Sequence, residues 1–92
     1  MRTLHVSDED VKAFYETVLK LESEEDCRAF FDDLCTANEL KQFAQRIKAA
    51  RLLMQDKTYQ QVIAETDISS CTLARVSRCV QEGEGYRRFL EP

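Results

Sequence analysis

Glycine and proline are nearly absent from this chain of 92 residues, which contains only Gly83, Gly85 and Pro92. A fold of several short strands needs such residues at its turns, so their scarcity argues against a β-sheet. Alanine, leucine, glutamate, lysine, glutamine and arginine are abundant instead, and all six are good helix formers. The sequence therefore predicts an all-α fold, and its length allows a single domain over 1–92.

The chain also lacks the groups that most enzymes use. Its one histidine, His5, lies in a predicted disordered tail, and there is no glycine-rich phosphate loop and no Ser/His/Asp or Cys/His grouping on neighbouring elements. Cys27, Cys35, Cys71 and Cys79 form two pairs eight residues apart, unlike the ligand spacing of a zinc ribbon. We expect reduced, mostly half-buried cysteines, no metal, no cofactor and no enzymatic activity.

Long apolar runs are missing as well. No stretch approaches the length that spans a bilayer, and the first residues do not contain the apolar core of a secretory signal. We therefore expect a soluble, cytoplasmic protein that does not associate with membranes.

Charge is unevenly distributed along the chain, whose net charge is −4. Residues 1–40 contain eleven acidic and four basic residues, whereas residues 41–92 contain six acidic and nine basic ones. Nucleic-acid-binding proteins usually carry a basic surplus, so we expect any anion binding to be confined to the second half.

The first half of the chain contains three sequence signals for the start of a helix. Ser7 and Ser23 are each followed by three acidic residues, which favour a helix N-terminus, and these signals predict helices over 8–21 and from 24 to about 34 or 35. Thr36 and Glu39 have the spacing of a capping box, which predicts a third, long helix with basic side chains on its outer faces.

Aromatic side chains on these helices exceed what two short helices can bury against one neighbour. They are Phe14, Tyr15, Phe30, Phe31 and Phe43. Burial against a second copy of the chain is one explanation, and an ordinary intrachain core is the alternative.

The segment 58–78 has the spacing of a helix-turn-helix. Thr58 is placed to cap a helix that runs to about Thr66, Asp67 occupies the turn position that requires a positive φ, and Ser69 is placed to cap the next helix. The positions expected to point inward are Val62, Ile63, Thr66, Ile68, Leu73 and Val76.

The outward face of the second helix is small, polar and basic. It comprises Ser69, Ser70, Cys71, Ala74, Arg75 and Arg78. Small side chains let a helix backbone approach base edges in a major groove, and arginines reach phosphates or guanine. The alternative is an ordinary helical bundle in which this face is merely solvated.

Further motifs occur in a fixed order between residues 34 and 90. They are Cys35, Thr36, Glu39 and Leu40, then Arg46, then Leu52 and Leu53, and finally Gly83, Gly85 and Tyr86. In this combination the chain resembles the tryptophan-repressor superfamily, and specifically its YerC/YecD branch.

The resemblance implies a six-helix subunit in an intertwined homodimer that binds double-stranded DNA at a palindromic operator. Residues 1–57 would form the dimerisation helices, 58–82 the helix-turn-helix and 83–92 a C-terminal helix or tail. The two reading heads would lie one helical turn of DNA apart, roughly 34 Å. In the family, DNA contacts come from positions that match Gln60, Gln61, Ser70, Cys71 and Ala74.

The resemblance also concerns a small-molecule effector. In the family's founding member, tryptophan is held by two arginines that match Arg46 and Arg75. A glycine and a serine that accommodate the indole there are replaced by Val76 and Cys79 here, so we do not expect tryptophan to bind. An unknown effector at the two arginines remains open; alternatively, they balance Glu39 or Glu65 as surface charges.

Two other functions remain open at this stage. The acidic first half would suit a helical adapter that docks on a basic protein rather than on DNA. The helix-turn-helix pattern also resembles a fragment of a sigma factor, although such modules work within a longer chain.

Overall fold

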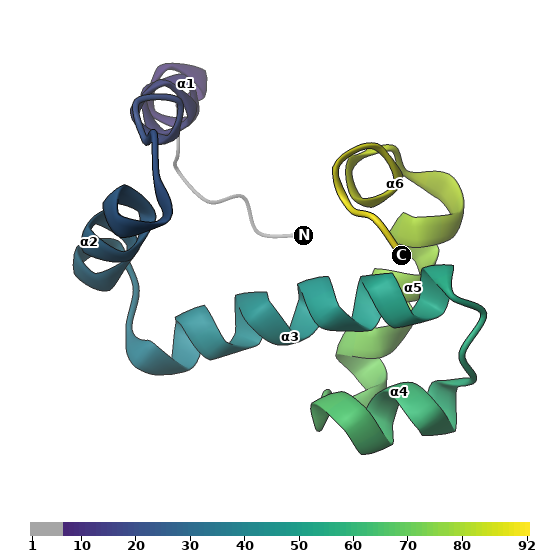
Figure 1. Ribbon diagram of the computed structural model, residues 1–92. Helices are drawn as coiled ribbons and strands as arrows, with labels where there is room; N and C mark the ends of the chain where they lie inside the picture. Colours follow the sequence, from purple (N-terminus) through teal and green to yellow (C-terminus); the bar gives the residue numbers. More distant parts are fainter. Residues whose placement is uncertain (1–6) are drawn as a thin grey trace. The chain divides into compact units, whose positions relative to one another are not determined.

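The structure, a computed structural model, describes residues 7–92 and consists there of helices without strands (Figure 1). His5 lies outside the described residues. The all-α, six-helix prediction is confirmed, and no helix in the part described is both long and apolar enough to cross a bilayer. The helices are α1 Asp8–Val18, α2 Glu24–Leu34, α3 Ala37–Met54, α4 Tyr59–Thr66, α5 Ser70–Glu82 and α6 Gly85–Phe89.

The chain divides into two compact units, one ending at Leu34 and the other spanning Cys35–Pro92. The first contains α1 and α2, and the second contains α3 to α6. Helix α3, which the sequence grouped with the dimerisation helices, therefore packs in one unit with the helix-turn-helix.

Helices α1 and α2 begin where their serines predict. Ser7 Oγ accepts a hydrogen bond from the Asp10 amide at 3.1 Å, and Ser23 Oγ accepts one from the Asp26 amide at 3.0 Å. Helix α1 ends at Val18, earlier than predicted, because the chain tightens into bonds between residues three apart, from Lys20 to Thr17 and from Leu21 to Val18.

Neither α1 nor α2 contains a buried residue. Tyr15 of α1 is 60% exposed, and Leu19, which caps the C-terminal end of α1, is 82% exposed. These two helices therefore carry an apolar surface that their own unit leaves open to solvent.

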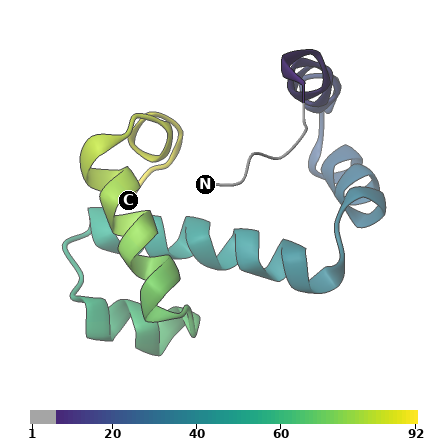
Figure 2. The ribbon, with the colours of Figure 1, turned by 180° about the vertical axis from the view of Figure 1, so that it is seen from behind.

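The core of the second unit lies where α3, α4 and α5 meet (Figures 1 and 2). Ala49 and Ala50 of α3 have no exposed surface, and Val62 of α4 and Leu73 of α5 are equally buried. Alanines at a helix crossing allow the two backbones to approach closely, so α5 is held firmly across the C-terminal half of α3. The other buried apolar residues are Leu52, Ile68, Val76 and Val80.

The predicted capping box at the start of α3 is confirmed. The Thr36 amide donates to Glu39 Oε1 at 2.9 Å, and the Glu39 amide donates to Thr36 Oγ1 at 3.1 Å. The hydrogen bond from the Thr36 backbone, assisted by the one with its side chain, holds the pKa of Glu39 below its ordinary value. The carboxylate form is therefore preferred in the folded protein.

This shift predicts a pH-dependent contribution to stability. Because the folded pKa is lowered, the contribution is complete above the pKa of an unfolded glutamate, about 4.3, and is lost as the pH falls through the folded value. We expect Glu39→Gln to lower the melting temperature at neutral pH and to match the wild type in strong acid. Thermal unfolding followed by circular dichroism measures both, with Glu91→Gln as a control; a difference that persists in acid would contradict the assignment.

Candidate DNA interface

The turn between α4 and α5 is fixed by its backbone conformation and by one buried side chain. Asp67 has a φ of 63° and a ψ of 16°, the left-handed conformation that the sequence predicted for it. Thr66 Oγ1 donates to the Val62 carbonyl at 2.7 Å and accepts from the Ile68 amide at 3.2 Å. These bonds leave no polar group of the Thr66 side chain unsatisfied in the core.

Helix α3 supports this turn from outside the motif. Gln45 Nε2 donates to the Thr66 carbonyl at 2.9 Å, and Lys48 Nζ donates to the Glu65 carbonyl at 3.3 Å. Both carbonyls belong to the last turn of α4, where they lack partners within the helix and where the helix dipole favours a cation. The end of α4, where the turn begins, is thus held by the apolar core and by two side chains of α3.

The face of α5 that the sequence singled out is open to solvent. Ser69 caps the helix, since its hydroxyl accepts from the Thr72 amide at 3.2 Å and donates to Thr72 Oγ1 at 2.9 Å. All eight residues predicted to contact DNA are exposed, and none belongs to the core: Gln60, Gln61, Ser69, Ser70, Cys71, Ala74, Arg75 and Arg78. The positions predicted to point inward are buried or partly buried.

Gln61 also caps the start of α4, a structural role that was not predicted from the sequence. Its Oε1 accepts from the Thr58 amide at 2.9 Å while its own amide donates to Thr58 Oγ1 at 3.2 Å, which is a second capping box. The same Thr-x-x-Glu/Gln spacing that revealed the cap at Thr36 could have identified it. Only the Nε2 group of Gln61 remains free for another partner.

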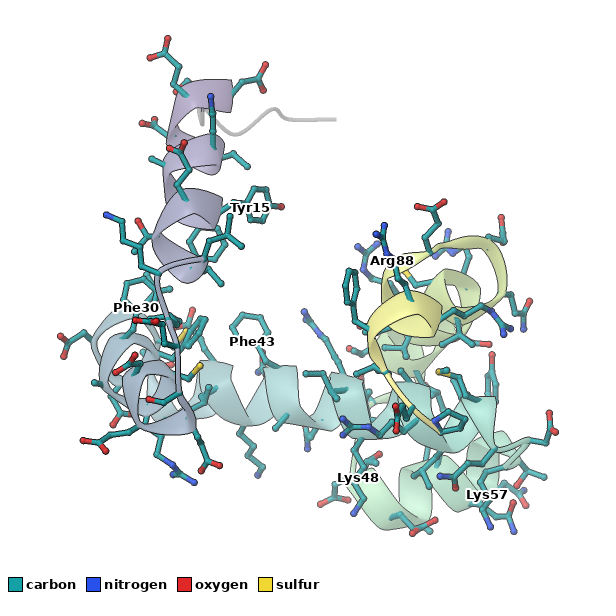
Figure 3. The ribbon with its side chains drawn as sticks, turned by 45° about the horizontal axis from the view of Figure 1, so that its top comes forward. Tyr15, Phe30, Phe43, Lys48, Lys57 and Arg88 are labelled. Carbon is teal, nitrogen blue, oxygen red and sulfur yellow. The ribbon has the colours of Figure 1, made fainter. Side chains whose placement is uncertain are left out.

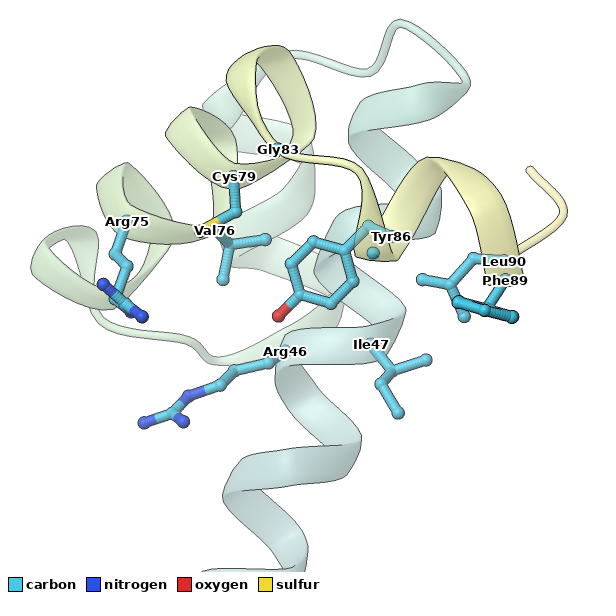
Figure 4. Close-up of a pocket in the computed structure, with 10 residues that line it drawn as sticks. Arg46, Ile47, Arg75, Val76, Cys79, Gly83, Tyr86, Phe89 and Leu90 are labelled. Carbon is cyan, nitrogen blue, oxygen red and sulfur yellow. The ribbon is translucent and has the colours of Figure 1, made fainter. Parts of the chain in front are cut away.

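Arg46 and Arg75, predicted to bind an effector, meet at one cavity of about 520 Å³ (Figure 4). The two arginines lie at one end of this cavity, and the apolar end is formed by Ile47, Phe89 and Leu90. The further lining residues are Val76, Cys79, Gly83, Gly85 and Tyr86.

Tyr86, which the sequence analysis named only as part of a motif, lies inside the lining of this cavity. Its ring lies between Val76 of α5 and Arg46 of α3, and its hydroxyl points toward the end with the arginines (Figure 4). Tyr86 also packs against the apolar core, so this side chain anchors the short α6 to the rest of the unit.

The two arginines are not surface charges that balance a carboxylate. Within residues 7–92 no acidic side chain lies within ion-pair distance of either of them, and the one ion pair found there joins Arg28 to Glu24. The Arg46 guanidinium instead lies over the ring of Phe43, 5.8 Å from its centroid, and Phe43 projects from the middle of α3 (Figure 3).

The cysteines form no cluster of potential metal ligands in the described part of the chain. Cys27, Cys35 and Cys79 are partly exposed, as expected, whereas Cys71 is exposed on α5. All four are free thiols.

Comparison with known proteins gives consistent results. The model of the Trp repressor protein family matches residues 9–92. The uncharacterised protein YerC of Bacillus subtilis strain 168 is 40% identical over 83 residues, which cover 89% of this chain and 80% of YerC.

Two solved structures are similar over nearly the whole chain. A crystal structure of a candidate Trp repressor from Staphylococcus aureus has a TM-score of 0.82 and 32% identity, and the match covers 92% of this chain and 89% of that one. A TrpR-like protein from Eubacterium eligens has a TM-score of 0.85 and 30% identity, with 94% and 96% covered.

The left-handed conformation of Asp67 predicts a difference in stability between two substitutions at this position. Glycine adopts a positive φ without steric cost, whereas alanine has a Cβ that clashes there, so Asp67→Gly should be more stable than Asp67→Ala by about 1 kcal/mol. Urea unfolding measures the difference. The same pair of substitutions at Asp56, which also has a φ of 63°, provides a matched site, and equal stability of the two variants would show that the turn changes conformation.

Proposed function

The chain belongs to the Trp repressor protein family, a family of DNA-binding regulators, and on that premise we propose that it is a sequence-specific transcriptional repressor that binds a palindromic operator as a homodimer. The observation that carries the proposal is the solvent-exposed face of α5, held on a rigid core beside α4. Exposure is what a reading helix needs, because its side chains must reach base edges without unfolding the domain.

The chemistry of this face suits a major groove. Ser69, Ser70 and Ala74 are small, so the α5 backbone can come close to the base pairs. Cys71 and Ala74 offer apolar surface to thymine methyl groups, while Arg78 can reach a phosphate or the edge of a guanine. Gln60, at the exposed start of α4, and the free Nε2 of Gln61 supply further donors.

The dimer is supported by apolar surface that α1 and α2 leave exposed within their own unit. Helices α1 and α2 contain no buried residue, and Phe14, Tyr15 and Leu19 remain exposed. Two short helices without a core are not stable by themselves, so burial against a second copy accounts for their apolar stripes. A two-fold axis would also give two reading heads, which is what a palindromic operator requires.

The cavity between α3, α5 and α6 is the proposed site of a small-molecule effector. Arg46 and Arg75 at one end would bind an acidic group, and the rest of the lining is mostly apolar. We further propose that tryptophan is not this effector, because the branched side chain of Val76, 2% exposed, occupies space next to Arg75 that a glycine would leave open.

DNA binding should depend on the positive charge of the α5 face. We expect Arg78→Glu to abolish binding to genomic fragments selected by the wild-type protein, whereas Arg28→Glu, the same charge change on α2, should not. Binding should also weaken steeply as salt rises, since counterions are released from the phosphates. Fluorescence anisotropy measures affinity, and circular dichroism verifies that each variant is folded.

The rival functions give different outcomes in the same assay. An adapter for a basic protein would tolerate Arg78→Glu and would lose its partner on substitution of Asp32 and Asp33 by lysine. A sigma-factor-like module would be a monomer, whereas light scattering should report a dimer at micromolar concentration. Undiminished DNA affinity in Arg78→Glu would refute the proposed reading face.

A thermal-shift screen tests the exclusion of tryptophan. A ligand at about a hundred times its dissociation constant stabilises the folded state by about 2.7 kcal/mol, which raises the melting temperature measurably. We expect no shift with tryptophan. Any ligand that raises the melting temperature of the wild-type protein should no longer do so in Arg46→Gln. A clear rise with tryptophan would overturn our interpretation of Val76.

A further inference from the structure

The ring of Tyr86 divides the large cavity between α3, α5 and α6. In Figure 4 it stands between the end formed by Arg46 and Arg75 and the apolar end near Leu90. We propose that Tyr86 determines which ligand this cavity takes: its ring excludes ligands that contain a ring, its hydroxyl is a third anchor beside the two arginines, and the ligand is a compact aliphatic dicarboxylate. The inference rests on the part of the proposed function that assigns an acidic effector to the cavity.

The fold holds Tyr86 in position from both sides. A Cβ at Gly83 would lie 2.8 Å from the Cys79 carbonyl oxygen, so only glycine lets the chain turn back this closely against the end of α5. Beyond the turn, Arg87 Nε donates to the Val80 carbonyl, and the side chain of Tyr86 packs against the core. The ring is therefore a fixed part of the shape of the cavity.

The hydroxyl of Tyr86 is available to a ligand. It points toward the end with the arginines, and it makes no hydrogen bond within residues 7–92 (Figure 4). Tyr86 is only partly buried, so a ligand can reach this group. A phenol hydroxyl that donates to a carboxylate forms a charge-assisted hydrogen bond, which is stronger than one between neutral groups.

The charge of the lining favours a ligand with two negative charges. Of the ten residues that line the cavity, Arg46 and Arg75 are cationic and none is acidic. The arginines belong to different helices, so a dicarboxylate can give one carboxylate to each, whereas a single carboxylate leaves one cation without full compensation. Arg46 Nε is buried without a hydrogen-bond partner, so the terminal nitrogens of this guanidinium are the atoms that a ligand reaches.

The space beside Tyr86 limits the size of the ligand. The cavity measures about 520 Å³ in all, but only the part on the arginine side of the ring adjoins both the cations and the hydroxyl. A second ring in this part would overlap with Tyr86 or with Val76, and neither can give way because both pack in the core. A short aliphatic chain between two carboxylates fits beside the phenol ring without displacing it.

Calorimetric titration of the free protein compares succinate with butyrate. The two acids have equally long carbon chains and differ in the second carboxylate. We expect succinate to bind at least about tenfold more tightly, because its second carboxylate gains charge-assisted hydrogen bonds to the other arginine. Ionic strength is held constant, since salt screens an exposed charge such as that of Arg75. Equal affinities for the two acids would overturn the assignment of a dicarboxylate.

The hydroxyl is tested by Tyr86→Phe, which keeps the ring and its packing. Succinate affinity should fall about tenfold with the loss of one hydrogen bond to a charged group, while the melting temperature without ligand stays close to that of the wild type. Arg88→Gln is the control, because Arg88 is exposed on the same short helix and does not line the cavity, and it should bind succinate as the wild type does. Unchanged succinate affinity in Tyr86→Phe would show that the hydroxyl is not an anchor.

Removal of the ring tests the exclusion of other rings. Tyr86→Ala should bind phenylsuccinate, which the wild type should not, since the vacated space accommodates the phenyl group. Tyr86→Leu keeps an apolar contact with the core and gives the same test if the alanine variant does not fold. Wild-type protein that binds phenylsuccinate as tightly as succinate would show that the ring does not restrict the ligand.

DNA binding is measured separately, on the selected genomic fragments and without added acid. If the wild-type protein binds DNA but succinate gives no heat beyond that of dilution, the inference is wrong and the DNA-binding regulator stands. If succinate binds with the expected pattern and no DNA fragment is selected, the cavity is a dicarboxylate site in a protein with another function.

Discussion

The close packing of α5 against α3 is the contact on which the rest of the second unit depends. Ala49 and Ala50 present almost no side chain at the crossing, so Leu73 and Val76 of α5 and Val62 of α4 fill the space directly above the α3 backbone. A closely packed core resists rotation of one helix against another, since a changed angle would open voids or force overlaps. The outward face of α5 is therefore a rigid surface, and its small and basic residues keep fixed positions relative to one another.

Arg46 connects two features of the same unit. It lines the large cavity at the end opposite Leu90, and its guanidinium lies over the ring of Phe43. An acidic group at this end of the cavity would therefore meet a guanidinium that lies against an aromatic face and not against a carboxylate.

At the two aspartates with positive φ, Asp56 and Asp67, backbone conformation and side-chain charge have separate effects. Aspartate is among the few residues with a Cβ that tolerate the left-handed region, so the turns form. At Asp67, however, the carboxylate stands close to the helix that is proposed to approach phosphates, where a negative charge weakens affinity. The lining of the large cavity contains no acidic residue, which is consistent with the proposed binding of an acidic group there in spite of that charge.

Short-range signals in the sequence determined much of this protein. Serine and threonine caps at residues 7, 23, 36, 58 and 69 placed the helix starts, and apolar periodicity identified Val62, Leu73 and Val76 as core residues, because a cap or a helical stripe depends only on residues a few positions apart. Only the tertiary structure decided what lies between helices. The ring of Tyr86 beside Arg46, the support of the turn by Gln45 and Lys48, and the unpartnered Arg46 Nε all join residues distant in the chain, whose approach is set by packing rather than by spacing in sequence.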